Sequence, residues 1–207
     1  NTKDQYFYTL AQTGLGTLWT RPDSEEKAAN AFRLAIARCE SIGMRARLPW
    51  IKLKLANVLA NVAEHGEEAE TIFRSIIDSG ANGSKAAMLA AYTNLGTYLN
   101  EMSKSAAEIT PLLDEAEAIY RKLPQPKKET LVSSVMTRAQ LYLDDEDYAG
   151  AIQKLQDTLE IVERAEDPEN LVLNGHAAEL CQLLAKSYAC IEAFDLAYYS
   201  QRNADYY

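Results

Sequence analysis

Apolar residues recur every three or four positions along much of the chain, which is the spacing of one face of an α-helix. The clearest stretch is 133–165, where two such segments are separated by the acidic turn Asp144–Asp147. Small residues stand among the large ones, with Ala139 in the first segment and Ala151 in the second. Because small side chains let two helices approach closely and large ones fill the space around them, this pattern predicts a helical hairpin.

The same pattern recurs 46 residues further along the chain. Ala139, Tyr142, Tyr148, Ala151 and Leu155 have their counterparts in Ala185, Tyr188, Phe194, Ala197 and Gln201. The residue types and their spacing resemble the tetratricopeptide repeat (TPR). The resemblance implies an all-α fold, a right-handed superhelical solenoid of about five antiparallel helical hairpins.

Earlier hairpins are marked by an alanine followed four residues later by an aromatic residue or leucine. The earlier pairs are Ala28–Phe32, Ala69–Phe73 and Ala116–Tyr120. With Ala151 of the pair Ala151–Leu155 and the variant Ala197, the alanines are 41, 47, 35 and 46 residues apart. Most of these steps exceed the usual repeat of about 34 residues. They resemble the extended TPR class of bacterial regulators and kinesin light chains. The predicted helices before residue 133 are 6–18, 25–37, 50–63, 67–77, 89–99 and 112–123.

Turn residues agree with these helices. Gly43 is expected just after the end of the second helix, and Ser84 is expected to cap the fifth. Residues 102–111 are expected to form a long connection. The acidic run Asp144–Asp147 lacks the spacing of a calcium loop, which predicts a solvated turn. We expect one repeat domain over residues 1–207, as a piece of a longer protein.

Composition narrows the possible partners. Hydrophobic residues make up 47% of the chain and charged residues 25%, as in ordinary globular proteins. The net charge of −9 disfavours direct binding to nucleic acid. Membrane insertion is not expected, because no apolar run approaches the roughly 20 residues that a spanning helix needs. We expect a cytoplasmic location, with a periplasmic or other extracytoplasmic one as the alternative.

The sequence offers little catalytic chemistry. Its histidines, His65 and His176, each lie beside a glycine, and neither belongs to a recognisable arrangement of nucleophile and base. Cys181 and Cys190 are nine residues apart, which places them on opposite faces of a continuous helix and prevents them from sharing a metal ion. We therefore expect no metal site, no cofactor and no enzymatic activity.

The TPR resemblance also implies where a partner binds. In that family the first helices of the hairpins line a concave groove, and amide side chains there can hold the backbone of an extended peptide. The alternative is that these are only polar residues tolerated on a wet face. The groove candidates, taken from the resemblance, are Asn57, Asn61, Thr93, Thr97, Asn100, Met136, Gln140, Gln182 and Lys186.

The C-terminal segment is unusually aromatic. Tyr198, Tyr199, Tyr206 and Tyr207 stand where a solenoid usually ends in a polar helix. Either a further helix follows, or this face pairs with a second copy of the chain.

The function that we expect is a protein- or peptide-binding regulatory or sensor module. The alternative is a passive scaffold or dimerisation module without switching.

Overall fold

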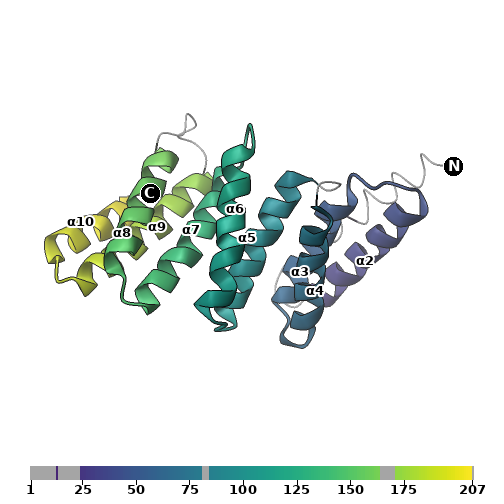
Figure 1. The fold of residues 1–207 in the computed structure, drawn as a ribbon, viewed down its shortest axis with the longest axis horizontal. Helices are drawn as coiled ribbons and strands as arrows, with labels where there is room; N and C mark the ends of the chain where they lie inside the picture. The colour runs from purple at the N-terminus through teal and green to yellow at the C-terminus, as the bar shows by residue number, and fades with distance from the viewer. Residues whose placement is uncertain (1–12, 14–23, 81–83, 164–170, 207) are drawn as a thin grey trace. The chain divides into compact units, whose positions relative to one another are not determined.

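The computed structural model describes residues 13, 24–80, 84–163 and 171–206, and these residues form helices and turns without any strand (Figure 1). The predicted helix at 6–18 lies outside the described residues, apart from Thr13. The elements in chain order are α2 (Glu25–Ser41), α3 (Leu48–Ala60), the short 3-10 helix η1 (Ala63–His65), α4 (Gly66–Asp78), α5 (Lys85–Glu101), α6 (Ala106–Lys122), α7 (Lys128–Asp144), α8 (Tyr148–Glu163), α9 (Leu171–Cys190) and α10 (Phe194–Tyr206).

The all-α prediction is confirmed, but one predicted connection is wrong. Residues 102–111 do not form a long link, because α6 already begins at Ala106 and contains Pro111. Proline lacks an amide hydrogen, so at this position it removes one hydrogen bond of the helix without preventing the turn. Ile109 and Leu113 on either side of it are fully buried, and their burial holds this part of α6 in place.

The described chain divides into two compact units, Asn1–Tyr98 and Leu99–Tyr207, with the boundary inside α5. In unit 1, α3 packs against both α2 and α4 (Figure 1). The alanine–aromatic pairs predicted to anchor these helices, Ala28–Phe32 and Ala69–Phe73, are at most 1% exposed. This pattern is therefore confirmed as the source of the core. The expected organisation as one domain over residues 1–207 stays a prediction.

In unit 2, each of the helices α7 to α10 packs against the next, and α7 also contacts α9. A hydrophobic cluster joins α7, α8 and α9, and it includes Ala139, Leu155 and Tyr188. The last hairpin leaves more of its apolar surface exposed than its counterpart 46 residues earlier. Phe194 is 67% exposed, whereas Tyr148 at the equivalent position is partly buried. The repeat thus continues into α10, but part of its apolar surface lies in solvent.

Three hairpin turns, α5–α6, α7–α8 and α9–α10, close in the same way. In each, a non-glycine residue has a left-handed backbone. The backbone N–H of the residue after it donates a hydrogen bond to the carbonyl oxygen five residues before that donor. The left-handed residues are Ser103, Glu146 and Glu192, with φ of 54°, 60° and 59°. After α2 the same motif uses the predicted Gly43, at φ 70°. The predicted cap at Ser84 is also confirmed, since its hydroxyl accepts the Ala87 amide hydrogen at 3.3 Å.

Candidate functional site

One face of α3 presents a polar stripe to solvent. The stripe consists of Trp50, Lys54 and Asn57 of α3 and of Asn61, which caps the C-terminal end of the helix. They follow one another at intervals of four, three and four residues, which places them on one side of the helix. All four are exposed, and Trp50 is 38% exposed. The opposite side of α3, including Leu55 and Leu59, is buried in unit 1. Burial of those leucines therefore fixes the stripe toward solvent.

An amide pair joins this stripe to α5. The Nδ2 of Asn94 donates a hydrogen bond to the Oδ1 of Asn57 at 2.8 Å, and the Nδ2 of Asn61 donates to the Asn57 carbonyl at 3.2 Å. Each asparagine has both a donor and an acceptor. The Asn57 amide hydrogens and the Asn94 amide oxygen are thus the complementary groups that the pair can offer to a ligand.

Sequence reasoning missed Asn94. The alignment with the TPR pattern selected Thr93 and Thr97 on the same helix. Thr93 is only 1% exposed, and its hydroxyl is buried without a hydrogen-bond partner among the described residues. Thr97 is partly buried. Asn94 could have been noticed because it carries an amide side chain one turn before Thr97. Its helix also lies next to α3, which carries Asn57.

The other candidates fall in unit 2 and do not form a single site. Met136 packs against the hydrophobic cluster of α7 to α9. Gln182 and Lys186 are exposed, one turn apart on α9. Asn100 and Gln140, in contrast, line one pocket together. The structure therefore brings together two of these five residues.

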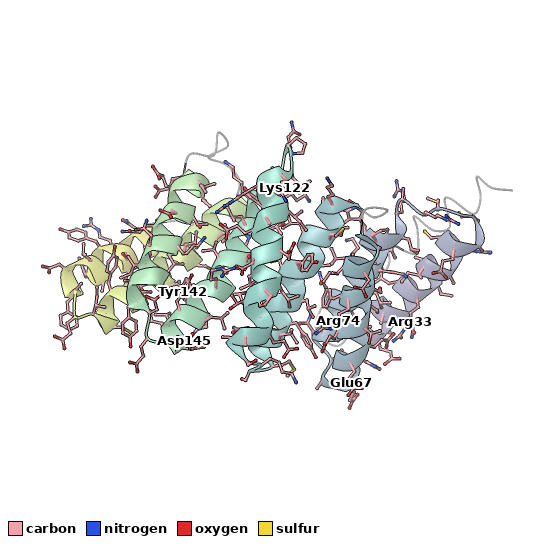
Figure 2. All side chains as sticks on the ribbon, in the orientation of Figure 1. Arg33, Glu67, Arg74, Lys122, Tyr142 and Asp145 are labelled. Carbon is pink, nitrogen blue, oxygen red and sulfur yellow. The ribbon has the colours of Figure 1, made fainter. Side chains whose placement is uncertain are left out.

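This pocket lies where α5 and α7 end, and its volume is about 350 Å³. Its lining residues are Asn100, Ser103, Lys104, Ala106, Gln140, Leu141, Asp144 and Asp145. The Nε2 of Gln140 donates to the Oδ1 of Asp144 at 2.7 Å, which orients that carboxylate. Figure 2 labels Asp145 beside the turn that leads into α8. The pocket therefore combines amides, carboxylates and one ammonium group.

Ion pairs link neighbouring hairpins elsewhere. In unit 1, Arg33 of α2, labelled in Figure 2, donates to both carboxylate oxygens of Glu68 on α4 at 2.7 and 3.4 Å. In unit 2, Lys154 of α8 donates to Glu117 of α6 at 3.0 Å. Burial opposes the ionisation of Glu117, but the hydrogen bonds and charges of Lys154 and Arg121 outweigh it and lower its pKa. These pairs join helices of successive hairpins and have a structural role.

Histidine and cysteine are among the side chains most often used in catalysis, and the structure describes both histidines and all three cysteines. Each histidine lies near a glutamate one turn later, with His65 3.9 Å from Glu68 and His176 3.2 Å from Glu179. The three cysteines are free thiols. Cys181 is buried and Cys190 exposed on the continuous helix α9, as expected for opposite faces. Burial, together with the charge of Glu163, raises the pKa of Cys181 to about 11.

The described residues lack two features, a metal-binding cluster and a membrane-spanning helix. They contain no group of three or more histidine, cysteine, aspartate or glutamate side chains that could hold a metal ion. In the same part of the chain, no helix is both long and apolar enough to cross a membrane.

Comparison with known proteins identifies the fold. No protein-family model matches the sequence, and no curated protein matches it. Two crystal structures from Podosopora anserina, one of them of a point variant, contain nearly identical TPR-like repeats of a protein described as a kinesin light chain. Each is 14% identical to this chain, with a TM-score of 0.68, and the match covers 94% of this chain and 92% of the other. The chain therefore has a TPR-like helical-repeat fold.

Proposed function

We propose that the chain is a protein-interaction module that binds an extended peptide segment along the solvent-exposed stripe of α3. The observation that carries this proposal is the Asn57–Asn94 amide pair. The donor and the acceptor that this bond leaves over match the carbonyl and the N–H of a ligand's backbone. Binding in this form needs only Asn57, which is exposed on α3, and Asn94, which is partly exposed on α5.

The spacing along α3 adds a side-chain preference. Trp50 precedes Asn57 by seven residues, which corresponds to about 10 Å along a helix. An extended peptide covers that length with about three residues. A ligand whose backbone is held by the amide pair thus brings an apolar side chain about three residues away onto the exposed ring of Trp50.

The test uses a displayed library of random peptides, followed by affinity measurements on the peptides selected. The double variant Asn57→Ala/Asn94→Ala should weaken binding about tenfold or more, because two hydrogen bonds to the ligand are lost. The control Gln153→Ala removes an exposed amide of α8 that bonds Asp157 at 2.7 Å. Equal affinity for the double variant and the wild type would refute the assignment of the α3 stripe.

A second candidate function is self-association through α10. Phe194, Leu196, Tyr198 and Tyr199 are between 50% and 67% exposed, whereas Ile152, the counterpart of Tyr198 on α8, packs against the hydrophobic cluster. Four such side chains offer roughly 400–500 Å² per chain, or about 900 Å² between two copies, close to the lower limit of a specific interface. The side chains of Tyr206 and Tyr207 lie outside the described part.

Light scattering coupled to size exclusion tests this second function. If α10 mediates pairing, Tyr198→Ser should shift a dimer to monomer, while Met102→Ser should not. Met102 is a suitable control because it is 53% exposed in another turn of unit 2. A wild-type chain that stays monomeric at about 100 μM would exclude pairing at the micromolar affinities of ordinary transient complexes.

The regulatory or sensor role also belongs to the proposal, and its support is the resemblance to extended TPR regulators. It requires that peptide binding at α3 alter residues outside the stripe. Hydrogen exchange measured with and without a selected peptide would detect this, and protection confined to α3 and α5 would favour a passive scaffold.

We propose a cytoplasmic location, which the three free thiols support. Imaging of a tagged chain in its source cells tests that assignment.

A further inference from the structure

The pocket at the ends of α5 and α7 is electrostatically negative, a property that the TPR resemblance did not imply for the groove candidates. Two of its lining side chains are the carboxylates of Asp144 and Asp145. Asp144 is also the last residue of α7, and Asn100 is in the last turn of α5. The carbonyl ends of two helices therefore face this region, and helix C-termini carry partial negative charge. All these groups favour a cation.

The charge distribution along the chain agrees with this preference. Unit 1 contains eleven basic and ten acidic residues, whereas unit 2 contains ten basic and twenty acidic residues. The net charge of the chain thus comes from unit 2. A cationic group approaching unit 2 is attracted over a longer range than the pocket alone would provide.

We propose that this pocket binds the guanidinium group of an arginine side chain from a protein partner, which rests on the proposed protein-interaction function. A planar guanidinium has five donors and can bond carboxylates and amide oxygens together. Asp144, oriented by Gln140, and the amide oxygen of Asn100 supply such acceptors. The volume of about 350 Å³ is at the lower end for ligand pockets, which suits one long side chain better than a larger molecule.

A metal ion is a poorer occupant than an organic cation. The pocket contributes only two carboxylates, and the described residues hold no set of three metal-binding side chains. Lys104 also lines the pocket, and its ammonium group repels a metal ion as well as competing with a bound arginine. The exposed Lys104 can swing away, because its long side chain is flexible.

The test uses a small probe, so that it does not depend on knowing the partner. N-acetyl-arginine amide is titrated into the 15N-labelled full chain and followed by NMR, with N-acetyl-citrulline amide as the neutral probe of the same shape. The arginine probe should shift the amide signals around Asn100 and Asp145, and the citrulline probe should not. Asp144→Asn and Asp145→Asn should each weaken binding about fivefold, from the loss of one charge–charge interaction in water.

Asp157→Asn is the matched control, because Gln153 bonds Asp157 at the same 2.7 Å and the same helical spacing, but outside the pocket. Lys104→Ala should tighten binding about fivefold by removing the competing cation. Equal binding of the two probes, or equal weakening by Asp157→Asn, would overturn the proposal. Loss of peptide binding at α3 with arginine binding retained would overturn the proposed function alone.

Discussion

Replacing Gly66 by alanine tests whether the close packing of α4 on α5 is a constraint within unit 1. Gly66 is the buried first residue of α4 and has helical dihedral angles, φ −58° and ψ −40°. Its conformation suits alanine, so backbone strain is not involved. A Cβ atom added at this position would instead collide with the hydroxyl of Tyr98, while the ring carbon that carries the hydroxyl would be 3.4 Å away.

The magnitude follows from two opposing effects. Alanine lowers the entropy of the unfolded chain and stabilises a compatible site by about 0.4–1 kcal/mol. Overpacking a tight contact costs about 1–3 kcal/mol. Gly66→Ala should therefore destabilise the wild type by about 1 kcal/mol. In a Tyr98→Phe background the hydroxyl is absent and 3.4 Å is an acceptable contact, so the same substitution should stabilise by about 0.5 kcal/mol.

The assay is urea unfolding of the four proteins of this double-mutant cycle, followed by tryptophan fluorescence. Both tryptophans, Trp19 and Trp50, belong to unit 1, so the signal reports the unit that contains the substitution. The cycle should give a coupling energy of about 1.5 kcal/mol. A coupling energy within about 0.3 kcal/mol of zero, which is the usual error of additivity, would refute the packing argument.

Three further predictions concern unit 2. The thiol of Cys181 has a pKa of about 11 in the folded chain and about 9 when unfolded. The free energy of unfolding should therefore fall as pH rises between these values, by up to roughly 2–3 kcal/mol. Cys181→Ala should remove that part of the fall, as measured by urea titrations. Asp147→Ala should cost about 1 kcal/mol, because Asp147 accepts the Gly150 amide hydrogen at the start of α8; the same urea titrations would measure this loss. Glu146→Gly should raise the thermal midpoint, since glycine relieves about 1 kcal/mol of left-handed strain; an unchanged midpoint would contradict this.

Much of the fold could be predicted because each helix depends on residues that are close together in the sequence. The alanine and the aromatic residue of each pair are one helical turn apart, and in Ala28–Phe32 and Ala69–Phe73 both residues are buried, with at most 1% exposed. Helix ends were less predictable. From Ala106 on, the connection predicted at 102–111 is instead the first part of α6, where the burial of Ile109 and Leu113 outweighs the hydrogen bond that Pro111 cannot make.

The candidate site depended on contacts between helices, which a repeat alignment does not specify. Asn94 is 37 residues from Asn57, and only the packing of α5 beside α3 brings the two amides together. Thr93, one residue away, points into the interior for the same reason. A shift of one position along a helix rotates a side chain by about 100°, so an alignment that is right on average can still select the wrong neighbour.

The acidic turn Asp144–Asp147 shows how one sequence feature divides into several physical roles. All four residues are exposed, which agrees with the predicted solvated turn. Glu146 adopts the left-handed backbone that reverses the chain, and Asp147 caps the helix that follows. Asp144 and Asp145 instead face the pocket that the end of α5 completes. The turn between α5 and α6 has the same backbone form but carries serine and lysine, so the cation preference that we propose depends on residues of the α7 turn rather than on a property of the repeat.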